Sequence, residues 1–154
     1  MAYDGARYLL HERAIAVLSA RMINDQNPKR VAAFPTFVNP LRWRAVAELR
    51  EGYWISDINL NEEFDPTEGR VFFQPESSSA IQQAMRLPDF QSFVRFNQFP
   101  LWRVLPVSDV EGAVKVELFD LRFGDPTAPA FVASAIIANG KPGQEGFQFG
   151  RPRL

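Results

Sequence analysis

The chain has 154 residues, of which 46% are hydrophobic and 23% charged, and its formal net charge is −1. This length corresponds to about one domain with enough apolar side chains for a core. The balanced charge lacks the basic surface that nucleic-acid binding requires, and the absence of cysteine excludes disulfides and thiolate metal sites. No apolar run approaches the roughly 20 residues that cross a bilayer, and no secretory signal is present. We therefore expect a soluble fold that neither inserts into a membrane nor binds nucleic acid.

The first predicted element is one long helix over residues 2–26. Ile15, Leu18 and Met22 recur there at helical spacing, and Pro28 would end the helix because the residue before a proline disfavours helical geometry. Short β-branched or aromatic runs between turn signals predict the strands that follow. These strands lie at 31–37, 43–49, 53–60 and 70–74.

Two short helices are predicted in the middle of the chain, at 77–86 and 89–98, the first with a serine as N-cap. Three further strands are expected, at 101–107, 113–123 and 130–138. Residues 140–154 are rich in glycine, proline and glutamine, and we expect them to fray or to end in a short strand at 147–149.

The order of these elements predicts an α+β fold. Connections this short require mostly antiparallel pairing, because a parallel pair needs a crossover of a dozen or more residues. We expect one soluble domain over 1–154, with a mostly antiparallel sheet of about six to eight strands. The long N-terminal helix and the two short middle helices would pack on this sheet. We see no internal repeat and no domain boundary.

Histidine chemistry has little support in the sequence. His11 is the one histidine, and a tetrahedral zinc site would need three carboxylates around it. Neither a second histidine nor an acid stands four residues later, where the chain has Ile15, and the Gly-x-Ser-x-Gly motif of serine hydrolases is absent. We interpret His11 as a surface or interfacial helix residue rather than a lone ligand or base.

An acidic segment follows the third strand and has the oxygen ligands of a calcium loop at several positions. The candidate ligands are Asp57, Asn59, Asn61, Asp65 and Glu68. The sixth position, where such a loop needs glycine for its sharp turn, is Glu62, and the preceding residues form a predicted strand rather than a helix. The alternative is a solvated acidic turn in which Phe64 fills the core.

A second candidate site consists of charged residues on predicted strands. Alternation places Arg42 and Arg44 on one sheet face and Trp43 on the other, so the arginines could hold a carboxylate or phosphate. Asp120 and Arg122 likewise share one face. These four residues would form an anion-binding or hydrolytic site if they met on one sheet face. The alternative is that they pair with sheet acids such as Glu48, Asp57 or Asp120.

The segment 90–99 contains four phenylalanines and could line a ligand pocket. Aromatic residues at helical spacing more often belong to a core, and we predict a core here.

Several short aromatic and proline motifs together resemble a known family. They are Ala33-Phe34-Pro35, Asn39-Pro40 with Trp43-Arg44, Phe64-Asp65-Pro66, Gln74-Pro75-Glu76, Phe99-Pro100 and Asp120-Leu121-Arg122-Phe123. Their order and spacing resemble the C-terminal soluble region of the YdjM-like metal-dependent hydrolases, which are inner-membrane-associated proteins also described as LexA-binding. The resemblance covers nearly the whole chain.

The resemblance implies that the chain is the extramembrane domain of a membrane-bound hydrolase, associated with the inner membrane, and that the membrane-embedded part of the parent protein is its partner. The family's histidine motifs and membrane spans are absent here. Any divalent metal would then belong to the parent protein. This domain would carry no cofactor and would bind a ligand or partner, or regulate the membrane part, without catalysing a reaction. A stand-alone domain that binds a small molecule or anion is the alternative, as is the hydrolytic sheet face described above.

Overall fold

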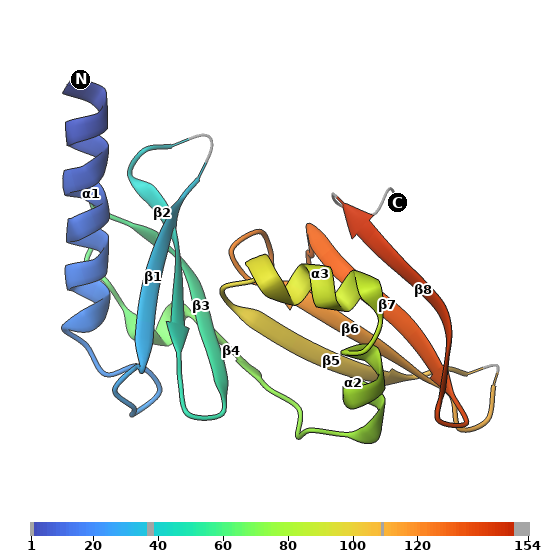
Figure 1. The fold of residues 1–154 in the computed structure, drawn as a ribbon. Helices are drawn as coiled ribbons and strands as arrows, with labels where there is room; N and C mark the ends of the chain where they lie inside the picture. The colour runs from blue at the N-terminus through green and yellow to red at the C-terminus, as the bar shows by residue number, and fades with distance from the viewer. Residues whose placement is uncertain (1, 37–38, 109, 150–154) are drawn as a thin grey trace. The chain divides into compact units, whose positions relative to one another are not determined.

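The computed structural model describes residues 2–36, 39–108 and 110–149. The chain divides into two compact units, Met1–Phe73 and Gln74–Leu154, and each has its own four-stranded antiparallel sheet (Figure 1). The predicted α+β class and antiparallel pairing are confirmed. The prediction of one sheet with six to eight strands is wrong, because the first four strands form one hydrogen-bonded sheet and the next four form another.

The first unit is a helix followed by a meander of four strands in the order β1-β2-β3-β4. Its elements are α1 (Ala2–Ser19), β1 (Arg30–Pro35), β2 (Arg42–Glu48), β3 (Gly52–Asn59), the short 3-10 helix η1 (Pro66–Glu68) and β4 (Arg70–Phe73). The four predicted strands are thus present, although residue 37 of the first prediction lies outside the described residues. α1 packs on β1 and β2.

The N-terminal helix ends earlier than the hydrophobic pattern predicts. It stops at Ser19, and Ile23 and Gln26 then bond to each other through both backbone groups at 2.9 and 3.0 Å. Asn24 and Asp25 between them have positive φ angles of 51° and 58°. Two such residues in succession form the tight turn that asparagine and aspartate tolerate best. The turn places Ile23 in the core, with no exposed surface.

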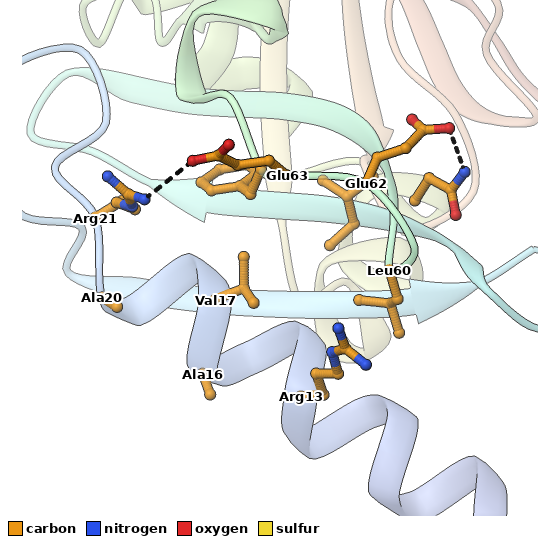
Figure 2. Close-up of a pocket in the computed structure, with 11 residues that line it drawn as sticks. Arg13, Ala16, Val17, Ala20, Arg21, Leu60, Glu62 and Glu63 are labelled. Atoms are coloured by element: carbon orange, nitrogen blue, oxygen red, sulfur yellow. Dashed lines mark hydrogen bonds and ion pairs between the residues drawn. The ribbon is translucent and has the colours of Figure 1, made fainter.

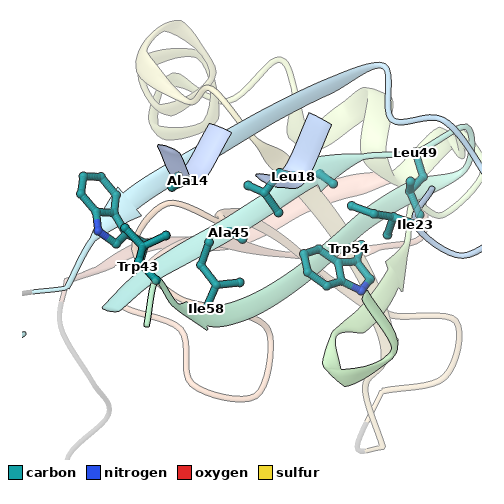
Figure 3. Packing of buried hydrophobic residues seen from close by; sticks show 11 residues of the cluster. Ala14, Leu18, Ile23, Trp43, Ala45, Leu49, Trp54 and Ile58 are labelled. Carbon is teal, nitrogen blue, oxygen red and sulfur yellow. The ribbon is translucent and has the colours of Figure 1, made fainter. Parts of the chain in front are cut away.

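The core of the first unit lies between α1 and one face of its sheet (Figure 3). Antiparallel register places Trp43 opposite Ile58 and Ala47 opposite Trp54 on this face, and Leu18 of α1 packs among them. Both indoles are almost fully buried, and each N–H donates to a backbone carbonyl, that of Trp43 to Pro40 at 2.9 Å. A buried donor without a partner would be costly, so these bonds stabilise the core. The prediction that Trp43 points inward is confirmed.

The second unit has two helices followed by a meander in the order β5-β6-β7-β8. Its elements are α2 (Ser79–Ala84), α3 (Pro88–Phe96), β5 (Pro100–Pro106), β6 (Val114–Asp120), β7 (Phe131–Ala138) and β8 (Lys141–Phe149). Of the two alternatives for the C-terminal segment, the strand at 147–149 is present as the end of the longer β8, which pairs with β7 from Lys141 to Phe149, so the segment does not fray over these residues. Residues 150–154 lie outside the described residues.

The core of the second unit lies between its two helices and its sheet. Phe90 and Phe93 of α3 have no exposed surface and pack with β6 and β7 residues such as Leu118. The Phe90 ring also stacks on Trp102 of β5, with centroids 5.7 Å apart. The interpretation of this aromatic helix as core is confirmed for these two phenylalanines, whereas Phe96 is 48% exposed.

Candidate functional site

A half-open groove of about 440 Å³ lies beside α1 in the first unit (Figure 2). Its lining residues come from the C-terminal half of α1, the turn after α1, the end of β3 and the loop that follows β3. They are Arg13, Ala16, Val17, Ala20, Arg21, Ile58, Asn59, Leu60, Glu62, Glu63 and Phe64. This volume falls within the range of small-ligand sites, about 300–1,000 Å³.

The groove has an apolar floor because of how helix and strand present their side chains. Ala20, in the turn directly after α1, lies four residues from Ala16 and three from Val17, and its backbone N–H donates to the Ala16 carbonyl at 3.1 Å, so these residues gather on one side of the helix end. Their small side chains leave space where larger residues would fill it. Ile58 and Leu60 form the floor on the strand side, and both are buried.

Charged side chains stand on both edges of the groove. Arg13 extends from α1 and Arg21 from the turn that follows it, whereas Glu62 and Glu63 extend from the loop after β3. Arg21 and Glu63 approach to 4.0 Å, but their side chains are 56% and 91% exposed. Such a solvated ion pair contributes little stability and can exchange for other partners. Glu62 also accepts a hydrogen bond of 2.6 Å from the Asn59 amide.

A smaller hollow of about 290 Å³ lies nearer the start of α1 and contains the one histidine. It is lined by Arg7, Tyr8, His11, Pro35 and Trp43. The His11 ring lies 5.7 Å from the Trp43 ring, and its Nδ1 is 3.6 Å from the Glu12 carboxylate. His11 is half-buried against the sheet, which agrees with its interpretation as an interfacial helix residue.

The four residues of the predicted anion site do not meet on one sheet. Arg42 and Arg44 belong to β2 in the first sheet, whereas Asp120 ends β6 in the second. Arg44 donates to Asp57 across the β2–β3 pair at 3.1 Å, as the alternative interpretation predicts. The condition for this site, one shared sheet face, is therefore not met.

Asp120 and Arg122 form a pair with each other at the end of β6. The Arg122 guanidinium donates to both Asp120 carboxylate oxygens at 2.6 to 3.0 Å, and to the Phe96 carbonyl at 2.7 Å. The Asp120 side chain has no exposed surface. This pair ties the end of β6 to the end of α3, which is an architectural role.

The residues of the predicted calcium loop have other partners. Asp57 pairs with Arg44, and one Asp65 oxygen accepts bonds from the Thr67 backbone and hydroxyl at 2.8 and 2.7 Å. Asp65 thereby caps η1, and these bonds lower the pKa of its carboxyl. Asn59 accepts from the Asn61 backbone at 3.2 Å. Within the described ranges, no three His, Cys, Asp or Glu side chains gather in a way that could hold a metal ion, and Glu68 lies in η1 rather than in an exiting α-helix.

A buried carboxylate in the second unit is a feature that the sequence did not reveal. The side chain of Glu117 in β6 is 7% exposed. Its carboxylate forms ion pairs with the Arg103 guanidinium at 2.6 Å and with the Lys115 ammonium at 2.7 Å. Burial alone would raise the pKa of Glu117, but hydrogen bonds from Lys115 and Arg103 outweigh it and hold that pKa below its ordinary value. The Arg103 guanidinium also lies over the Phe119 ring, 4.8 Å from its centroid. Register explains the cluster, since Arg103 and Glu117 are direct cross-strand partners.

No family model, no curated protein and no solved structure matches this chain. Among the described helices, none combines the length and apolarity needed to span a membrane. The groove beside α1 was not anticipated from the sequence. The signal that could have indicated it is the run of small residues on one side of a helix whose neighbouring positions carry arginine.

Proposed function

We propose that the chain is the extramembrane binding domain of a membrane-bound metal-dependent hydrolase, and that the groove beside α1 is its binding surface. Two observations support this proposal. The aromatic and proline motifs follow the order seen in the YdjM-like proteins, and the first unit has a groove with an apolar floor and charged edges. In this scheme the catalytic metal belongs to the membrane-embedded part, and the present domain binds a ligand or partner.

The groove carries the proposal because its geometry suits binding better than catalysis. Catalytic sites bring a nucleophile, base or metal ligands within hydrogen-bond reach of one another. The polar groups of the groove are instead two arginines and two glutamates on opposite edges of an apolar floor, with the Asn59 amide bonded to Glu62. Such a surface holds an amphipathic partner by apolar burial and orients it by charge.

Binding in the groove can be tested with the fluorescent probe 8-anilinonaphthalene-1-sulfonate, which has apolar rings and one anionic group. We expect saturable fluorescence enhancement with the folded protein, and loss of most of it in Ala16→Trp, because the indole fills the groove. Ser92→Trp, at an exposed position of α3, is the matched control and should leave binding unchanged. Equal binding by all three proteins would place the probe elsewhere and contradict the proposal.

The membrane-protein part of the proposal has a separate test. The reading frame that encodes this chain should contain apolar segments with histidines upstream of Met1. An assay of the purified chain with p-nitrophenyl phosphate and p-nitrophenyl acetate, with added divalent metals, should give no turnover. Turnover that survives repeated purification would contradict the assignment of catalysis to another part of the protein.

A further inference from the structure

The helix-bearing face of the first sheet is covered by one helix, whereas the corresponding face of the second sheet carries two. In the second unit, α2 and α3 together contact β6, β7 and β8, and Phe90 reaches Trp102 of β5. In the first unit, α1 packs on β1 and β2. The β3 half of the same face is covered in part by Phe64, whose ring meets Trp54 edge-on at 5.8 Å. The groove therefore lies where a second helix would pack.

The α1 wall of the groove suits close approach by another helix. Ala16 and Ala20 are exposed, and Val17 is half-buried between them. Small side chains at such spacing let two helix backbones approach closely, because neither helix has to move to make room. From Arg13 to the end of α1 at Ser19 the helical wall extends about 9 Å, which is a little under two helical turns.

The edges of the groove have opposite charge. The edge formed by α1 and the turn after it has the guanidinium groups of Arg13 and Arg21, and the loop edge has the carboxylates of Glu62 and Glu63. Arg13 is exposed to solvent, and Arg21 has only the 4.0 Å contact with exposed Glu63 as an ion pair among the described residues. A ligand in this groove therefore meets cations on one side and anions on the other.

We propose that the groove binds an amphipathic α-helix of a partner protein. This inference rests on the proposed function and specifies its ligand. The bound helix presents an apolar stripe of about two turns to Ile58, Leu60 and Ala16, in the pattern i, i+3 or i+4, and i+7. It carries acidic residues along the edge that faces α1 and basic residues along the edge that faces Glu62 and Glu63. Charge complementarity on both edges favours this mixed helix over a helix of one charge.

Three synthetic helical peptides of about 14 residues test this inference, since that length gives about four turns. All three share one apolar stripe. The first has glutamate on one edge and lysine on the other, the second has glutamate on both edges, and the third has lysine on both. Because reversing a helix exchanges its edges, the mixed peptide can satisfy the groove in one of its two directions, whereas each single-charge peptide always meets one repelling edge.

Fluorescence anisotropy at low ionic strength should show the mixed peptide binding about five- to tenfold more tightly than either single-charge peptide. This preference should shrink at high salt, where exposed charges are screened. In the double variant Glu62→Lys/Glu63→Lys both edges are basic, so the preference should move to the all-glutamate peptide. The amide NMR signals of Ala16, Val17 and Ala20 should shift on binding.

Equal affinity for the three peptides, or an unchanged preference in the double variant, would overturn the inference. Ala16→Trp should weaken the mixed peptide, and a cooperative unfolding transition in that variant shows that it is folded. If the anilinonaphthalene probe binds in the groove and no peptide does, the helix inference fails and the binding groove stands as a small-molecule site. If neither binds, both proposals fail.

Discussion

The Asp120 carboxylate and the Arg122 guanidinium, two residues apart, form a forked ion pair inside the second unit. Arg122 Nε lies 3.0 Å from both Asp120 oxygens, and Nη2 lies 2.6 Å from Oδ2. The Asp120 side chain is completely buried, and that of Arg122 is 17% exposed. Removing one partner of a buried pair is costly because the other charge is left without compensation.

Asp120→Asn should therefore lower the free energy of unfolding by about 3 kcal/mol, the lower end of the range for such pairs, because Arg122 retains some contact with water. Asp57→Asn is the matched control. It removes the partner of Arg44 from a pair whose side chains are 27% and 57% exposed, and it should cost less than about 1 kcal/mol. Equilibrium urea unfolding measures both. If Asp120→Asn lowers the free energy of unfolding no more than Asp57→Asn does, the buried pair contributes no more stability than the exposed pair.

The Glu117 cluster predicts a pH dependence of stability. The pKa of Glu117 is lowered in the folded state, so its contribution is present above the unfolded pKa, about 4.3, and is lost as pH falls through the folded pKa. The difference in melting temperature between wild type and Glu117→Gln should be large at pH 7 and should shrink toward pH 3. Exposed Glu111→Gln is the control and should differ little from wild type at either pH. A difference that grows on acidification would contradict the sign.

Gly69 stands against the Trp54 indole without room for a side chain. A Cβ at this position would overlap the Trp54 ring, although the backbone φ of −82° suits any residue. Gly69→Ala should destabilise the fold by about 1–3 kcal/mol, the usual cost of overpacking a core.

Gly5→Ala provides the contrast, because nothing lies within 4 Å of the added Cβ and the residue is inside α1. It should stabilise the protein by about 0.5–1 kcal/mol through helix propensity. Urea unfolding of the two variants should shift in opposite directions, and a shift in the same direction would contradict the steric account of Gly69.

The turn between β7 and β8 depends on asparagine in a left-handed conformation. Asn139 has a φ of 50°, and Gly140 follows with a φ of 71°. Asn139→Ala should lower the free energy of unfolding by about 1 kcal/mol, because the alanine side chain cannot form the local hydrogen bonds that stabilise asparagine in this conformation. Asn139→Gly should remain close to wild type in thermal unfolding. Equal losses in both variants would point to side-chain contacts rather than backbone conformation.

Calcium should leave the protein unchanged. The Asp57 and Asp65 oxygens already accept bonds from Arg44 and Thr67, so binding would have to break them. We expect no heat in calorimetric titration with calcium chloride and no shift in melting temperature. A calcium-dependent shift that disappears in Asp65→Asn would restore the site predicted from the sequence.

Much of the fold could be predicted because periodicity and turn residues mark its elements. The strand around Trp43 alternates apolar and polar side chains, which places the indole in the core and Arg44 outside. The helix end was missed because Ile15, Leu18 and Met22 keep helical spacing past the true end. The Asn24-Asp25 turn, which decides where the chain turns back, is a two-residue signal that periodicity does not detect.

The C-terminal strand was predicted only over 147–149, with fraying as the alternative, whereas β8 begins at Lys141. Asn-Gly between two extended runs is the strongest short hairpin signal, yet the proline at position 142 and the following glycine favour a loop. Pro142 is accommodated because β8 is paired on one side in its sheet, opposite Ile137, where the register shifts. The small residues near the end of α1 indicate only that space is left beside the helix. The position of the groove could not be derived from the sequence, since it depends on which half of a sheet face one helix covers.

The strand order described for both sheets has a consequence for how the protein folds. Every strand pairs with the strand before or after it in the chain, so each sheet is built from hairpins. Closing short loops costs less chain entropy than joining distant segments, and proteins rich in such local contacts fold quickly. The first sheet is complete in sequence at Phe73, before any residue of the second unit has been synthesised. This topology therefore favours folding of the first unit before the second during translation.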